Sequence, residues 1–106
     1  LLVRTDKGCF PDGATVDAEG YIWSAQWAAS RVVRYSPEGE IDFILPLPIS
    51  QPTCAAFGGP ALNRLFVTSA YQGLNAEARK TEPEAGNLFI FETDAKGIAD
   101  PLFQPR

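Results

Sequence analysis

The feature that most constrains this chain is a repeated short apolar strand, preceded each time by a proline. "PDGATV" at residues 11–16 is matched by "PTCAAF" at residues 52–57, an offset of 41 residues from Pro11 to Pro52. Further strand-like segments follow each copy in the same order, at 22–25 and 31–35 and then at 66–69 and 87–91. A four-stranded unit repeating about every 40 to 50 residues is typical of a β-propeller blade. The alternative is a small Greek-key sandwich in which the similarity of the two segments is coincidental.

The rest of the chain favours strands over helices. Short apolar segments alternate with turns rich in Gly, Pro and Asp. Only residues 74–85 could hold a turn or two of helix, which Pro83 ends. Strands are predicted at 1–5, 14–17, 21–26, 31–35, 41–45, 54–57, 64–69, 87–91 and near 102–103.

We therefore predict an all-β fold made of two four-stranded antiparallel blades of a β-propeller. Residues 1–8 would form the outer strand of a preceding blade, residues 11–47 one blade, and residues 52–104 the next. The second blade carries a long insertion at 72–86, which explains why the repeat offset grows along the chain. We expect this insertion to be a lid-like loop.

Two blades cannot close a ring, because propellers have about four to eight. Their flanking faces, rich in Val, Phe and Ile, would lie in water. The chain has no Met and begins with "LLVRTDKG", which is interpreted as part of a strand that starts earlier. We therefore expect either a piece of a longer protein or copies that associate to cover these faces.

Composition narrows the function classes. The net charge of −4 argues against nucleic acid and anionic membrane as partners, and no apolar run approaches the roughly 20 residues of a membrane span. The sequence has no His, which excludes Ser-His-Asp and Cys-His catalysis and a His-bound zinc. Cys9 and Cys54 are interpreted as small buried thiols in a reducing compartment, the cytoplasm, although spacing leaves one disulfide open.

Three longer stretches carry a family resemblance. They are "PDGATVDAEGYIWSAQWAASRVVRYSPEGE" at 11–40, "QPTCAAFGGPALNRLFVTSA" at 51–70 and "EAGNLFIF" at 84–91. Together they resemble the family of regucalcin (senescence marker protein), gluconolactonase and luciferin-regenerating enzyme, in order and over nearly the whole chain. The resemblance implies a six-bladed propeller of which this chain is the C-terminal third.

The resemblance also implies an activity and a cofactor. The family consists of metal-dependent hydrolases that act on sugar-acid lactones or similar esters. One divalent cation, Ca²⁺ above all or else Mg²⁺, Zn²⁺ or Mn²⁺, lies near the axis at one mouth of the ring. The cation polarises the substrate carbonyl, and an aspartate in "PDG" serves as its ligand and as a catalytic base. In this sequence that position is Asp12.

Each candidate residue also has a structural interpretation. Without the resemblance, Asp12 would be an Asx-turn acid beside a glycine. Thr53 holds the repeat position of Asp12 and either lines the mouth or simply begins a strand. Trp27 and Tyr71 follow the second strands of the two blades, where each could stack on a sugar ring or pack.

Other charged and aromatic side chains are assigned structural positions. Asp17 and Glu19 are predicted to be turn residues of "DAEG", Arg34 is placed on a solvated strand edge, and Trp23 in the core between blades.

Three function classes stay open. The first is part of a lactonase or esterase whose remaining cation ligands come from earlier blades, so that the isolated chain would be inactive. The second is a catalytically incomplete propeller fragment that acts as a self-associating binding or structural module. The third is a strictosidine-synthase-like propeller, but "PDG" followed by "DAEG" fits the lactonase group better.

Overall fold

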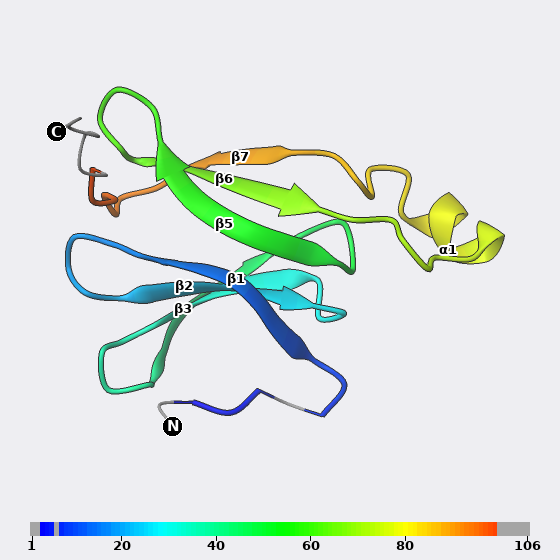
Figure 1. Ribbon diagram of the computed structural model, residues 1–106, viewed down its shortest axis with the longest axis horizontal. Helices are drawn as coiled ribbons and strands as arrows, with labels where there is room; N and C mark the ends of the chain where they lie inside the picture. The colour runs from blue at the N-terminus through cyan, green and yellow to red at the C-terminus, as the bar shows by residue number, and fades with distance from the viewer. Residues whose placement is uncertain (1–2, 6, 100–106) are drawn as a thin grey trace, which may run out of the picture.

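The structure is a computed structural model that describes residues 3–5 and 7–99 (Figure 1). Within these residues the chain forms strands and one short helix. They are β1 (Phe10–Val16), β2 (Ile22–Trp27), β3 (Arg31–Tyr35), β4 (Ile41–Pro46), β5 (Pro52–Gly58), β6 (Arg64–Ser69), α1 (Ala76–Thr81) and β7 (Phe89–Glu92). The prediction of an all-β fold is confirmed.

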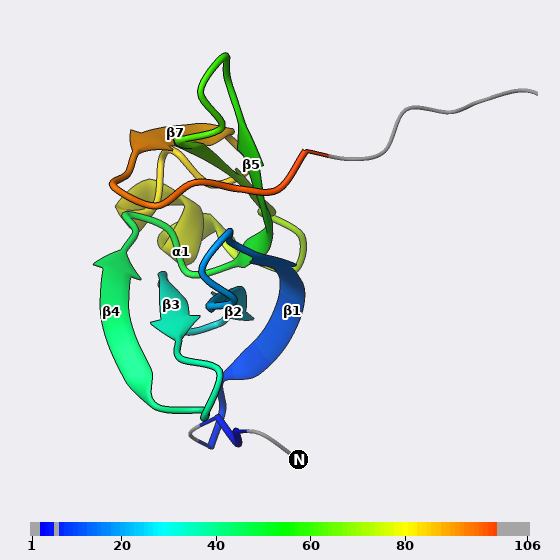
Figure 2. The ribbon, with the colours of Figure 1, turned by 90° about the vertical axis from the view of Figure 1, so that its left-hand side faces the viewer.

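The strands form two antiparallel sheets, each a simple meander. The first has the order β1-β2-β3-β4 and the second the order β5-β6-β7. Figure 2 shows the first sheet curving below the second, with β1 and β4 at its two edges. The strand expected near 102–103, which would complete the second sheet, lies outside the described residues.

The expected outer strand over residues 1–8 does not form in its described part. Residues 3–5 are irregular and residues 7–8 are a turn. A strand needs a hydrogen-bonded neighbour, and no described strand lies alongside this segment to provide one.

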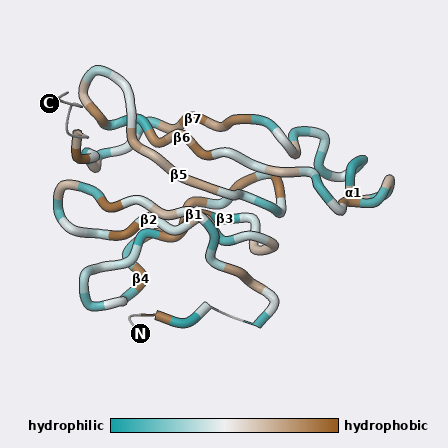
Figure 3. The backbone as a smooth tube through the Cα atoms, in the orientation of Figure 1, coloured by the Kyte–Doolittle hydropathy of each residue, from teal (hydrophilic) through white to brown (hydrophobic). Residues whose placement is uncertain are grey.

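A hydrophobic core lies between the two sheets. Trp23, Val32, Leu65 and Val67 are almost completely buried there. The rings of Trp23 and of Phe57 in the other sheet pack nearly perpendicular to each other with centroids 5.5 Å apart, which confirms the predicted place of Trp23 in the core. Figure 3 shows hydrophobic residues along the facing strands of the two sheets.

The first strands of the two sheets lie side by side. A Cβ added at Gly13 of β1 would come within 2.6 Å of the Cys54 Sγ and 2.8 Å of the Cys54 Cα on β5. Glycine at position 13 is therefore required by the close approach of the two backbones. Neighbouring first strands agree with the repeat of "PDGATV" and "PTCAAF", and β1 and β5 run in the same direction in Figure 1.

The insertion at 72–86 contains α1, as the sequence suggested. Asn75 caps the helix by accepting a hydrogen bond from the Ala78 N–H at 2.8 Å. The Glu82 carboxylate accepts from the Ser50 N–H at 2.6 Å, which attaches the insertion to the connection between the sheets. No helix in the described part of the chain is long and apolar enough to cross a membrane.

Candidate functional site

Asp12 lies in an irregularity of β1. Pro11 pairs with Gln26 and Ala14 with Ser24, so Asp12 and Gly13 together face the single residue Ala25. This is a β-bulge, which bends the strand and redirects a side chain. Asp12 is therefore inside β1, not before it as predicted, and it is exposed to solvent.

Thr53 lies in the equivalent bulge of β5. Pro52 pairs with Ser69 and Cys54 with Thr68, so Thr53 is the extra residue. Its hydroxyl shares a hydrogen bond of 2.6 Å with the Thr68 hydroxyl on β6. Because β1 and β5 are neighbours, the two bulges lie at the same end of the fold, as the repeat predicts. We refer to this as the Asp12 end.

Trp27 and Tyr71 also lie at the Asp12 end but have separate partners. Trp27 ends β2 and packs on Phe10 with ring centroids 5.8 Å apart. Tyr71 follows β6, is 53% exposed, and carries the Arg79 guanidinium 4.7 Å above its ring. Within the described residues no hydrogen bond or ring contact joins Asp12, Thr53, Trp27 and Tyr71 to one another.

The donor set at the Asp12 end is too small for a complete cation site. Hard cations such as Ca²⁺ take six to eight oxygen ligands, typically including more than one carboxylate. Residues 3–5 and 7–99 contain no group of three or more His, Cys, Asp or Glu side chains placed to hold a metal. One exposed carboxylate fits one ligand position of such a site.

The sequence interpretation missed Asp17, the carboxylate that accepts the most hydrogen bonds in the described part of the chain. Asp17 is 1% exposed. Its Oδ1 accepts from the backbone N–H groups of Glu19 at 2.9 Å and Tyr21 at 3.1 Å. Its Oδ2 accepts from the Trp23 indole N–H at 2.9 Å and from the Arg34 Nε and Nη2 at 2.9 and 2.7 Å. Asp17 does begin the predicted turn, but it also anchors the first sheet.

Arg34 is the cationic partner of this cluster and corrects a second prediction. It is not on a solvated edge: its side chain is 13% exposed and lies 3.8 Å above the Tyr21 ring. A second contact joins its Nη1 to Asp42 at 2.8 Å. The signal in the sequence was a Trp six residues after Asp17 and an Arg on the facing strand, which a turn motif alone does not reveal.

The electrostatics of Asp17 follow from these contacts. Burial raises the pKa of its carboxyl, but the hydrogen bonds from Trp23, Arg34, Tyr21 and Glu19 outweigh it and hold the pKa below the ordinary value. The carboxylate is therefore ionised at neutral pH and saturated with donors. It has no free lone pair directed at a substrate, so Asp17 is a structural residue.

Both cysteines are free thiols. Cys9 is partly buried, but Cys54 is exposed, so the expectation of a buried Cys54 is wrong. Cys54 projects from β5 against Gly13, where the glycine leaves room for it. A cytoplasmic location stays a prediction.

The two antiparallel sheets are closely similar to part of a solved regucalcin structure. The crystal structure of regucalcin, a calcium-binding protein from Agrobacterium tumefaciens, matches with a TM-score of 0.91 at 36% identity. The match covers 99% of this chain and 36% of that one.

Sequence comparison gives the family. A family model described as "SMP-30/Gluconolactonase/LRE-like region" matches residues 1–71, and the chain belongs to this family. L-arabinolactonase of Azospirillum brasilense is 42% identical over 99 residues, which are 93% of this chain and 32% of that protein. Regucalcin of Xenopus laevis is 38% identical over 103 residues, 95% of this chain and 34% of that protein. The chain thus spans about a third of the length of these relatives.

Proposed function

We propose that this chain forms the C-terminal part of a divalent-cation-dependent hydrolase of sugar-acid lactones or similar esters. The observation that carries the proposal is the position of Asp12. Its exposed carboxylate sits in a β-bulge at one end of the strand that packs against β5. Membership of a family that includes an L-arabinolactonase supplies the reaction class.

Asp12 would provide one oxygen ligand to the cation, Ca²⁺ in the first instance, and a base for water attack on the lactone carbonyl. A cation bound there would polarise that carbonyl. The remaining ligands would come from outside the described residues, because these contain no group of three or more His, Cys, Asp or Glu side chains placed to hold a metal. The isolated chain should therefore be inactive.

The substrate would lie at the Asp12 end. Tyr71 has about half of its surface free and is the better candidate for stacking on a sugar ring. The Trp27 ring already packs on Phe10, and the Thr53 hydroxyl is already hydrogen-bonded to Thr68. Both residues would therefore form the wall of the site without binding the sugar directly.

A chimaera tests the proposal. The matching C-terminal third of the Azospirillum brasilense L-arabinolactonase would be replaced by this chain, and hydrolysis of L-arabinolactone would be measured. We expect an active chimaera that loses activity in EDTA and regains it with a divalent cation. Asp12→Asn should reduce kcat/KM by about 100-fold or more, because a catalytic base alone contributes at least that factor.

Glu38→Gln is the matched control, because it removes an exposed carboxylate from the turn between β3 and β4, at the other end of the fold. Its activity should equal that of the parent chimaera. A folded chimaera in which Asp12→Asn keeps full activity would overturn the proposal.

A self-associating module is the second candidate function. Apolar side chains on the strands and in the segments before and after β7 are about half exposed or more. They include Phe10, Ile41, Phe43, Leu88, Ile90 and Ile98. Covering a few hundred Å² of such surface provides several kcal/mol at about 25 cal/mol per Å² before association costs. Light scattering of the isolated chain should then show an oligomer at micromolar concentration, and a monomer would remove this candidate.

A further inference from the structure

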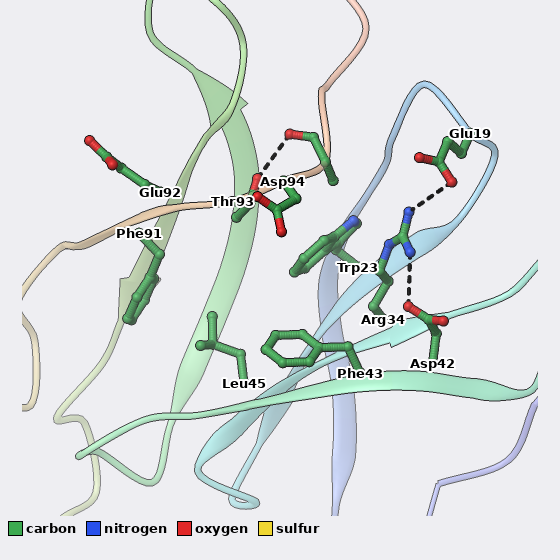
Figure 4. Close-up of a pocket in the computed structure, with 11 residues that line it drawn as sticks. Glu19, Trp23, Arg34, Asp42, Phe43, Leu45, Phe91, Glu92, Thr93 and Asp94 are labelled. Atoms are coloured by element: carbon green, nitrogen blue, oxygen red, sulfur yellow. Dashed lines mark hydrogen bonds and ion pairs between the residues drawn. The ribbon is translucent and has the colours of Figure 1, made fainter.

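A cavity between the two sheets has no part in the proposed hydrolysis. It has a volume of about 390 Å³, which is within the usual range for small-molecule sites. It lies between β2, β3 and β4 on one side and β7 with the segment that follows it on the other (Figure 4), and Asp12 is not among its lining residues. The lining residues are Glu19, Trp23, Arg34, Asp42, Phe43, Leu45, Phe91, Glu92, Thr93, Asp94 and Ala95.

The apolar wall of the cavity is aromatic and fixed in place. Trp23 is held by its indole hydrogen bond to Asp17 and by edge contacts with Phe57 at 5.5 Å and Phe43 at 6.3 Å. Phe43 is nevertheless 47% exposed, and Phe91 lines the cavity from the other sheet, with Leu45 between the two rings in Figure 4. A ligand would therefore meet preformed aromatic surface without rearranging the core.

The charges around the cavity exclude an anion. Four of its lining residues are carboxylates, and Arg34 is the single cation among them. The Arg34 Nε, Nη1 and Nη2 each donate to Asp17 or Asp42, so the positive charge of the guanidinium is already paired with protein carboxylates. An incoming anion would therefore face the surplus of negative charge around the cavity.

Asp94 is the carboxylate best placed to bind a cation. It lies beside Trp23 in Figure 4, whereas Glu92 points away from that ring. Asp94 is exposed and makes no ion pair with the described residues, and it follows Thr93, whose hydroxyl is bonded to the Asn63 and Ala95 carbonyls. Its charge is thus uncompensated next to the aromatic wall.

The geometry points to a binding site for a small arylalkyl ammonium ion in this cavity. The ammonium group would pair with Asp94, and the aromatic body would pack against Phe43, Phe91 and Trp23. Aromatic faces attract cations, and the surrounding carboxylates favour the same sign of charge. The site is independent of Asp12 and of lactone hydrolysis.

The two tryptophans provide a built-in test. Trp23 lines the cavity, and Trp27 lies at the other end of the fold. The ¹⁵N-labelled chain would be titrated with phenethylamine while both indole N–H resonances are followed by NMR, with Trp27→Phe used for assignment. We expect a saturable shift of the Trp23 resonance and none of Trp27. Phenethyl alcohol and phenylacetate, which match the ring but lack the positive charge, should bind at least about fivefold more weakly.

Variants complete the test. Asp94→Asn should weaken phenethylamine binding about threefold to fivefold, in the range of a solvent-exposed ion pair, and Phe43→Leu should weaken it as well. Glu77→Gln on α1 removes an exposed carboxylate far from the cavity and should change nothing. Equal binding of phenethyl alcohol, or no Trp23 shift at 10 mM phenethylamine with a well-dispersed spectrum, would overturn the inference.

Discussion

Replacement of Asp17 by Asn should destabilise the protein far more than any other exchange of a turn acid. The substitution keeps Oδ1, which serves the Glu19 and Tyr21 N–H groups. It replaces Oδ2 by an amide NH₂ that faces the Trp23 indole N–H and two Arg34 donors. Three attractive contacts thus become donor-to-donor repulsions inside the first sheet.

The size of the effect follows from burial. Removing one partner of a buried ion pair costs about 3–5 kcal/mol, because the remaining charge stays without compensation. Arg34 keeps Asp42, so we expect about 3 kcal/mol, the lower end of this range. A small domain has about 5–15 kcal/mol in total, so the variant should still fold but with a much lower unfolding midpoint.

Urea unfolding followed by tryptophan fluorescence measures this loss. Asp42→Asn is the matched control, because the same Arg34 contacts Asp42 at the surface, where a pair contributes at most about 1 kcal/mol. The double variant Asp17→Asn, Arg34→Met removes the stranded charge and should recover part of the lost stability. Equal destabilisation by Asp17→Asn and Asp42→Asn, or no coupling in the double variant, would refute the buried-anchor account.

Three further predictions concern pH, packing and the insertion. Because the pKa of Asp17 is lower in the folded than in the unfolded state, its stabilisation is complete above the unfolded value of about 4 and is lost as pH falls through the folded value. The free energy of unfolding of the parent, measured with urea, should therefore fall more steeply below about pH 4 than that of Asp17→Asn. Parallel pH profiles of the two proteins would contradict this. Gly13→Ala should cost about 1–3 kcal/mol in the same assay, because its Cβ would meet the Cys54 Cα at 2.8 Å. Since that contact is backbone, adding Cys54→Ala should not restore stability, and full rescue would disprove the close strand approach. Exchanging residues 72–86 for a four-residue Gly-Ser link should leave the β signal in circular dichroism intact. The reason is that the Ser69 hydroxyl donates a hydrogen bond of 2.6 Å to the Asn87 carbonyl, which joins the two ends of the insertion. Loss of that signal would mean that the insertion is structural.

Much of the fold was predictable from local chemistry. The strands β3 and β6 have the predicted bounds, and α1 falls in the polar segment that Pro83 ends. The adjacency of β1 and β5 followed from the repeat of "PDGATV" and "PTCAAF". These features depend on residues close in sequence or on a period visible along the chain.

The features that could not be predicted depend on contacts across the sheet. Asp17 and Arg34 are 17 residues apart, and only the β2–β3 register brings them together. The bulge that places Asp12 inside β1 likewise depends on which residue of β2 faces it. The exposed position of Cys54 beside Gly13 likewise depends on how the two sheets pack, which composition cannot reveal.

The role of Asp12 as a cation ligand is the central claim, and a calcium titration tests it most directly. The matching C-terminal third of the Agrobacterium tumefaciens regucalcin, a calcium-binding protein of closely similar structure, would be replaced by this chain. Ca²⁺ would then be titrated calorimetrically into the metal-free chimaera and into its Asp12→Asn variant, with Glu38→Gln as the control. We predict that Asp12→Asn weakens Ca²⁺ binding by more than about tenfold and that Glu38→Gln leaves it unchanged. Equal Ca²⁺ affinity of the parent chimaera and the Asp12→Asn variant would contradict the claim.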